Sequence, residues 1–247
     1  MRNLREAKEI VKGNLGSYGM IILSVLVLGL VLGALSLIPV LGSLAIIIGG
    51  IFAVVMEANA IKAVAVDNQP LGFVGILTEG FNKFKEVWFD TTKSYLFMVV
   101  CLAPFILIGL VTLLAPILAG FAAGSMDSVV SGLIGTSLLI LIYFIVLISL
   151  SVFFQYRFNY KVAGYVSGTD GKEVLKGSTG DIVKMTLVLM ATMLLTIIPF
   201  IGEIICLLLD LYLGFVYSTK VMLDVNEGAS ISYTESNYDS GSNVEYE

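Results

Sequence analysis

Four polar residues stand where long apolar runs would normally exclude them. Asp210 and Glu203 lie seven residues apart in the last apolar segment, and Glu57 and Asn59 lie near the end of an earlier one. A spacing of seven places Asp210 and Glu203 on the same face of a helix. Carboxylates inside a membrane are costly, so these four residues are candidates for an intramembrane polar site on an ion or substrate path.

Asp210 is the first of these candidates to consider. Lys220 is ten residues away, which is about 15 Å along a helix and too far for an ion pair. We therefore expect Asp210 to be protonated, to accept a hydrogen bond from a hydroxyl such as that of Thr192 or Thr196, or to face water. A purely structural role is an equally good interpretation.

The other polar residues also have simpler interpretations. Glu203 follows Pro199 and Gly202, and at a helix N-terminus its charge would stabilise the helix dipole. Glu57 and Asn59 lie near the inner end of their span, so their side chains could extend along the helix to the membrane surface.

The chain lacks the residues and motifs of most catalytic centres. It contains no histidine, which excludes Ser-His triads and histidine metal sites. No HExxH, GxSxG, P-loop or dinucleotide fingerprint occurs. Two carboxylates on one helix face do not supply the nucleophile or metal that a hydrolase needs. We expect no catalytic residue, cofactor, metal site or nucleic-acid partner, and no enzyme activity.

Composition and charge spacing indicate an all-α membrane protein. The 247 residues are 57% hydrophobic and 13% charged, whereas soluble domains carry about 25% charged residues. Residues 13–56, 94–126 and 128–156 contain no charge at all. As one helix the first run would measure about 66 Å, roughly twice the thickness of a hydrocarbon core, so it must cross the membrane and return.

The apolar runs predict six transmembrane helices in three hairpins. All 14 Lys and Arg residues fall before the first span, from the last residue of the second span to the start of the third, from the end of the fourth span to the first residues of the fifth, or near the end of the sixth. The positive-inside rule therefore places both termini in the cytoplasm. The expected spans are residues 18–38, 43–62, 95–120, 129–156, 182–198 and 203–223.

Two short motifs recur and indicate a parallel internal repeat. KEIVKG at residues 8–13 returns as KEVLKG at 172–177, and IPVLG at 38–42 returns as IPFIG at 198–202. Each copy reads as a basic segment, a span, a tight Pro-Gly hairpin and a returning span. Both copies begin on the same side of the membrane, so the repeat is parallel rather than inverted.

The repeat divides the predicted transmembrane domain, residues 1–224, into three units. Each unit is expected to begin with a short cytoplasmic amphipathic helix. The polar, acidic segment 225–247 is expected to be a disordered cytoplasmic tail. The units are residues 5–66, 73–166 and 170–224.

Four residues are candidates for contacts with lipid headgroups or a partner protein. Trp88 and Phe84 lie on the apolar face of an amphipathic segment that begins at residue 73, and Arg157 and Lys161 lie within an aromatic cluster. Two simpler interpretations remain open: the amphipathic segment packs on the helix bundle, and the two cations reach from an aromatic belt to the membrane surface.

The segment AKEIVKGN at residues 7–14 resembles the opening of a large family of uncharacterised six-helix bacterial integral membrane proteins, a domain of unknown function. The two Ile-Pro-x-x-Gly hairpins are also distantly similar to the membrane domain of glycerophosphodiester phosphodiesterases. The resemblance implies a multi-pass protein of the bacterial plasma membrane. It implies no activity that transfers to this chain.

Two functions fit this description best, and a membrane-embedded enzyme that acts on lipid is a less favoured third. The first is a transport or permeation component for a small molecule, lipid or peptide, which Asp210, Glu203 and the repeat favour. The alternative is a non-catalytic accessory or immunity-type partner in a membrane complex, which the short outer loops and the polar tail favour. The expected partners are the lipid bilayer and either another membrane protein or a second copy of the chain.

Overall fold

The computed structural model of the chain is all-helical in its described parts, which are residues 2–38, 41–122, 126–169, 172–193 and 201–239. The expected all-α class is confirmed. The helices are α1 (Arg2–Gly13), α2 (Leu15–Leu35), α3 (Leu41–Ala65), α4 (Phe73–Ala122), α5 (Met126–Ser167), α6 (Lys172–Met193) and α7 (Ile201–Asp239).

Helices α4 and α5 are longer than the spans predicted within them. α4 runs for 50 residues, so the amphipathic segment is not a separate helix but the first part of α4. No proline interrupts the chain between Phe73 and Tyr95. α5 continues past Tyr156 to Ser167, and the φ of 77° at the next residue, Gly168, ends the helix. There the N–H of Thr169 donates to the carbonyl of Gly164 at 2.8 Å, as in a left-handed helix cap.

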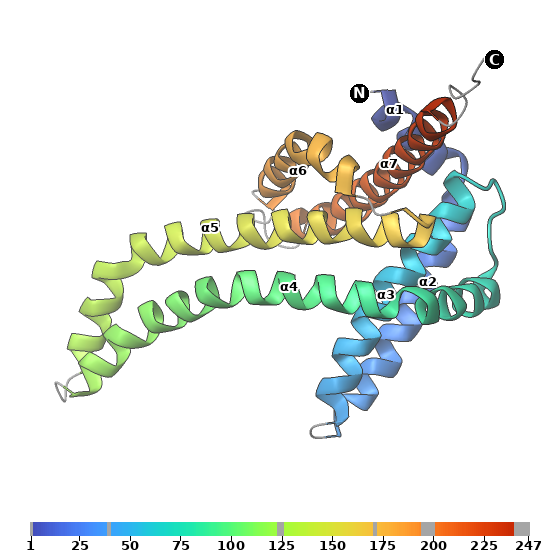
Figure 1. Ribbon diagram of the computed structural model, residues 1–247. Coiled ribbons are helices and arrows are strands. Elements are labelled where there is room, and N and C mark those ends of the chain that lie inside the picture. Colours follow the sequence, from blue (N-terminus) through green and yellow to red (C-terminus); the bar gives the residue numbers. More distant parts are fainter. Residues whose placement is uncertain (1, 39–40, 123–125, 170–171, 194–200, 240–247) are drawn as a thin grey trace, which may run out of the picture.

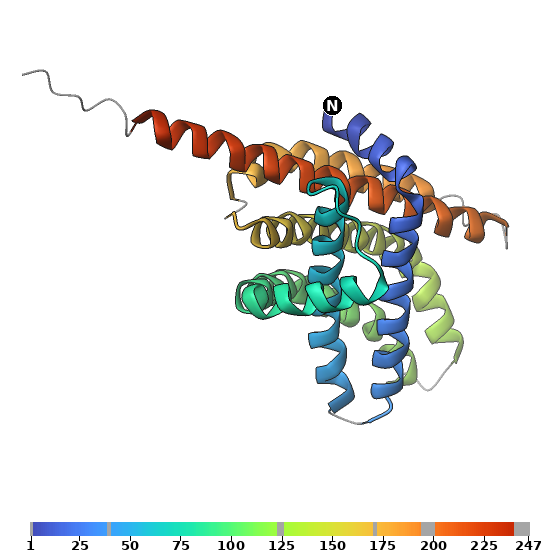
Figure 2. The same ribbon diagram turned by 90° about the vertical axis from the view of Figure 1, so that its right-hand side faces the viewer.

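Neighbouring helices pack in pairs (Figures 1 and 2). α2 lies along α3, and α4 lies along α5. α1 lies against α7, and α6 contacts both α5 and α7. The α2–α3 pair points downward in Figure 1 and the α4–α5 pair points to the left, so the pairs diverge from the region where they meet.

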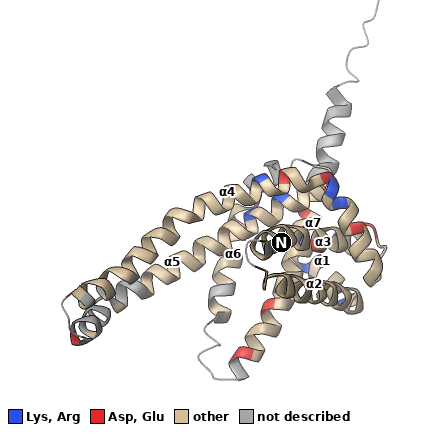
Figure 3. Cartoon of the chain, turned by 90° about the horizontal axis from the view of Figure 1, so that it is seen from below, with Lys and Arg blue, Asp and Glu red and all other residues tan. Residues whose placement is uncertain are grey.

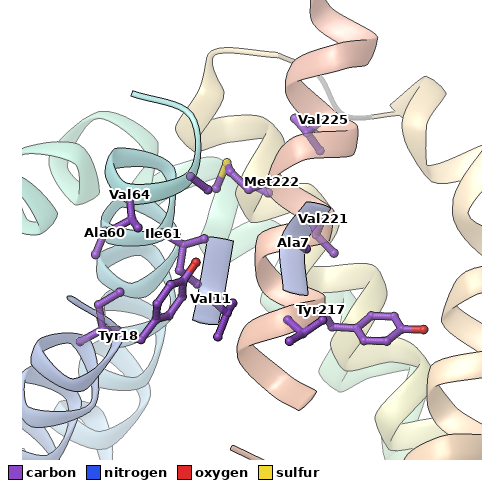
Figure 4. Packing of buried hydrophobic residues seen from close by; sticks show 14 of the residues in the cluster. Ala7, Val11, Tyr18, Ala60, Ile61, Val64, Tyr217, Val221, Met222 and Val225 are labelled. Carbon is purple, nitrogen blue, oxygen red and sulfur yellow. The ribbon is translucent and has the colours of Figure 1, made fainter. Parts of the chain in front are cut away.

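The buried core lies in that meeting region and contains part of every helix. Figure 4 shows residues of α1, α3 and α7 packed there. Tyr18 of α2 also reaches α7, where its hydroxyl lies 2.6 Å from the Thr219 hydroxyl and its ring packs on Phe215. We call this cluster the hub: Ala7, Val11, Tyr18, Ile21, Met56, Ala60, Ile61, Val64, Ala65, Ile76, Tyr156, Tyr160, Ala163, Ile182, Met185, Val216, Tyr217, Val221, Met222 and Val225.

Beyond the hub the helix pairs extend as arms whose apolar side chains are largely exposed. In the most apolar 18-residue stretch of α4 only 6% is buried within the protein, and in the corresponding stretch of α5 only 11% is buried. Figure 3 shows Lys and Arg around the hub and none on the far part of the α4–α5 pair. Apolar surface of this extent is stable in lipid rather than in water.

Five helices in the described part of the chain are long and apolar enough to cross a membrane. They lie in α2, α3, α4, α5 and α7. The predicted span 182–198 begins in α6 and runs into residues 194–200, outside the described residues. α7 continues to Asp239, and so extends helix into the segment for which the sequence predicts a disordered tail. Residues 240–247 also lie outside the described residues.

Candidate functional site

A partly open cavity of about 90 Å³ lies beside the hub, between α3, α5 and α7. Each of these helices contributes at least one polar side chain: Glu57 from α3, Gln155 and Asn159 from α5, and Ser218 from α7. The volume has room for several water molecules or one small organic group. The rest of the lining is apolar: Val54, Ala58, Ile61, Val162, Ala163, Val221 and Met222.

Close packing on both sides of Glu57 fixes its position. Met56 and Ile61 are fully buried in the hub. Gly80 lets α4 approach α3 at Met56, because a Cβ at residue 80 would lie 2.7 Å from the Met56 Cγ and 3.1 Å from its Cα. The α3 backbone that carries Glu57 is therefore held by the hub on one side and by α4 on the other.

Glu57 is the only acidic or basic residue in the lining of this cavity. Within the described part of the chain, neither its carboxylate nor the hydroxyl of Ser218 has a hydrogen-bond or ion-pair partner. The Gln155 amide donates to the Asn159 Oδ1 at 3.3 Å, which orients both side chains one turn apart on α5. The cavity therefore offers an unpaired acid and neutral polar groups.

An ionic network centred on Lys220 lies beside the hub. Its ammonium lies 2.8 Å from Asp181 of α6 and 2.5 Å from Asp224 of α7. The hydroxyl of Tyr160 donates to Asp224 at 3.2 Å and joins α5 to the network. The hydrogen bond from Lys220 holds the pKa of the Asp181 carboxyl below its usual range. The network binds α5, α6 and α7 together.

Asp210 lies outside the cavity, between α6 and α7. Its carboxylate accepts a hydrogen bond from the Thr192 hydroxyl at 2.8 Å and one from the Cys206 thiol at 3.3 Å. The prediction of a hydroxyl partner is confirmed for Thr192, whereas Thr196 lies outside the described residues. Glu203 is exposed in the first turn of α7, as the helix-dipole interpretation requires. The hydrogen bond between Thr192 and Asp210 therefore links α6 to α7.

The structure therefore separates the four predicted polar residues. Glu57 lines the cavity, while Asn59, two residues later on α3, does not. Asp210 and Glu203 lie on the α7 arm, at least eight residues before Ser218.

The candidate lipid or partner contacts lie on α4 and α5. Phe84 packs its ring 5.5 Å from that of Phe52 on α3, so it helps hold α4 to α3. Trp88 is half-exposed at 51% and Arg157 is exposed, so both are free to meet lipid headgroups. Lys161 lies 5.4 Å over the Phe97 ring, a cation–π contact between α5 and α4.

Sequence reasoning missed Gln155, Asn159, Ser218, Asp181 and Asp224. One signal was available for Gln155 and Asn159, since two amides four residues apart share a helix face in a segment rich in aromatic residues.

Comparison with known proteins adds no relative, because no family model, curated protein or solved structure matches the chain. The functional argument therefore depends on the geometry of the cavity.

Proposed function

We propose that this chain is a multi-pass protein of the bacterial plasma membrane that acts as a transport or permeation component for a small molecule. The observation that carries the proposal is the acidic cavity, which takes polar groups from α3, α5 and α7. The cavity lies between apolar helices that are long enough to span a membrane, so these helices would separate a polar cargo bound in it from most of the surrounding lipid.

The position of the cavity along its helices fits this proposal. Glu57, Asn159 and Ser218 each lie eight or nine residues before the end of their candidate spans, and Arg157 and Lys161 flank Asn159 on α5. With the Lys- and Arg-rich side in the cytoplasm, this proposal places the cavity at the inner interface of the membrane, level with Arg157 and Lys161.

The internal repeat gives further support. At the offset of 160 residues that relates the two Ile-Pro-x-x-Gly motifs, Ala58 corresponds to Ser218 and Ile61 to Val221. All four residues line the cavity. Two units of a parallel repeat would thus contribute equivalent positions to one site, and repeat interfaces are where many transporters bind their cargo. In this proposal the chain forms three transmembrane hairpins, the third from α6 and α7.

The proposal predicts that the cavity can be reached from both sides of the membrane. Ser218→Cys, in a chain that also carries Cys101→Ala and Cys206→Ser, should react with a membrane-impermeant maleimide in right-side-out vesicles and in inside-out vesicles. A transport site opens to each side in turn, so reagent added on either side reaches the thiol. Labelling is measured by mass shift of the purified protein.

Two single-cysteine controls define the sides. Ser36→Cys, exposed in the α2–α3 connection, should react from outside only, and Asp67→Cys, exposed after α3, from inside only. If Ser218→Cys reacted from one side only, transport would be refuted. An accessory or immunity-type partner would then be the better account.

A further inference from the structure

The charge of the cavity selects its ligand. Glu57 is its one acidic or basic lining residue and has no partner in the described part of the chain. Lys220, which follows Ser218 by two residues on α7, forms ion pairs with Asp181 and Asp224 and not with Glu57. A carboxylate in such a site is stable when it is protonated or when a cation joins it. An anionic ligand would be repelled, whereas a cationic one would complete the site.

The remaining lining favours an organic cation over a bare metal ion. Most of the lining side chains are aliphatic, and the volume of about 90 Å³ is far larger than one inorganic ion needs. Ca²⁺ and Mg²⁺ sites need several oxygen ligands in a defined geometry. In the described residues no group of three or more His, Cys, Asp or Glu side chains could hold a metal. An aliphatic wall beside a carboxylate suits a ligand that carries a short carbon chain and a positive charge.

The polar groups further favour an ammonium ion that has N–H donors. Glu57, Asn159 and Ser218 all offer oxygen acceptors, and they come from three different helices. A primary ammonium has three donors, as the lysine side chain does. Quaternary ammonium ions are usually held by aromatic cages, and the lining of this cavity contains no aromatic side chain.

We infer that the cavity binds a small primary alkylammonium ion, with the Glu57 carboxylate as its counter-charge and Asn159 and Ser218 as further acceptors. This inference rests on the proposed function, because it names the chemical class of the small molecule that the protein would transport. The alkyl group lies against the aliphatic residues of α5 and α7.

The probe is n-propylammonium, added to the full-length protein in lipid nanodiscs at constant ionic strength. A ligand that binds only the folded state raises the unfolding temperature as its concentration increases. Thermal unfolding is followed by the fluorescence of Trp88, the only tryptophan in the chain. We expect a saturable rise for n-propylammonium. We expect none for propionate or tetramethylammonium.

Two variants locate the binding. Glu57→Gln keeps the shape of the side chain and removes its charge, so it should weaken n-propylammonium binding roughly 10- to 100-fold, as for the loss of a charge-assisted hydrogen bond. Ser218→Ala should weaken it by less, roughly threefold to tenfold. Glu79→Gln is the matched control, because Glu79 is exposed on α4 and outside the cavity, and it should bind like the wild type. The unfolding temperatures without ligand should stay similar in all variants.

Several results would overturn the inference. They are the absence of any n-propylammonium effect on the wild type, an equal effect of tetramethylammonium or Na⁺, and undiminished binding by Glu57→Gln. The outcome is separable from that of the vesicle labelling. Binding without two-sided labelling removes transport and keeps the ammonium site, whereas two-sided labelling without binding removes the ammonium cargo and keeps transport.

Discussion

Lys220→Met should destabilise the protein by roughly 3 kcal/mol. Lys220 is almost completely buried, with only 8% of its side chain exposed, and it neutralises Asp181 and Asp224 together. Methionine fills a similar volume but leaves both carboxylates without their cation. Asp224 keeps the hydroxyl of Tyr160, yet Asp181 loses its link from α6 to α7. The free energy of unfolding in nanodiscs, from denaturant titration, measures the loss.

Lys184→Met is the matched control for this prediction. Lys184 also faces Asp181, but at 3.7 Å and with 63% of its side chain exposed, so its removal should cost less than about 1 kcal/mol. The contribution of Asp181 has a defined pH dependence. Its pKa is lowered in the folded state, so the stabilisation is present above its ordinary value of 3.8 and is lost as the pH falls through the lowered pKa. Equal effects of the two lysine variants at neutral pH would contradict a buried ionic network.

Gly80→Val should destabilise the protein by about 2–3 kcal/mol, the upper part of the usual range for overpacking a tight contact. Even the first added carbon would lie 2.7 Å from the Met56 Cγ and 3.1 Å from the Met56 Cα, and the Cα cannot move aside. α4 must then separate from α3 beside Glu57. We therefore expect Gly80→Val to weaken n-propylammonium binding as well, and both effects are measured in the same thermal titration.

Gly33→Val provides the comparison on a neighbouring helix. A Cβ at Gly33 meets nothing within 4 Å, so the same substitution should change stability by less than about 0.5 kcal/mol. Gly33 lies on an arm whose surface is expected to face lipid, which tolerates a valine. If Gly80→Val were as mild as Gly33→Val, the close contact of α4 with α3 would be wrong.

The membrane class could be predicted from sequence because it depends on totals and on one-dimensional patterns. Apolar runs and the distribution of Lys and Arg need no knowledge of packing. The ends of the long helices were harder to predict. Lys83 lies in a segment predicted as a separate short helix and Arg157 follows the predicted end of a span, yet one helix continues through each of them because no proline or left-handed residue stops it there.

The cavity could not be predicted because it depends on which helices meet. Ser218 is an ordinary polar residue in sequence, and Ala58 is an ordinary alanine. Asp210 drew attention because its hydropathy contrast is the sharpest, but the structure gives it two donors, Thr192 and Cys206. Glu57, which sequence explains equally well as reaching for the membrane surface, is the carboxylate with no described partner. The difference between these two acids lies in their neighbours: Asp210 has Thr192 on α6 and Cys206 one turn away on α7, whereas no described side chain donates to Glu57.

The central claim is that α3 and α7 face each other across one cavity at repeat-related positions. It is tested most directly by cross-linking the pair Ala58→Cys and Ser218→Cys in native membranes, with Cys101→Ala and Cys206→Ser in the same chain. A protease site inserted in the loop at residues 66–72 separates the two cysteines, so a short bis-maleimide that joins them keeps the fragments together on a denaturing gel.

The control is the pair Ile48→Cys and Leu208→Cys, which the same offset of 160 relates and which lie exposed on separate arms. We predict that the Ala58→Cys and Ser218→Cys pair cross-links efficiently and that the control pair does not, because the arms diverge beyond the hub. Failure of the first pair to cross-link, or equal cross-linking of both pairs, would contradict the account.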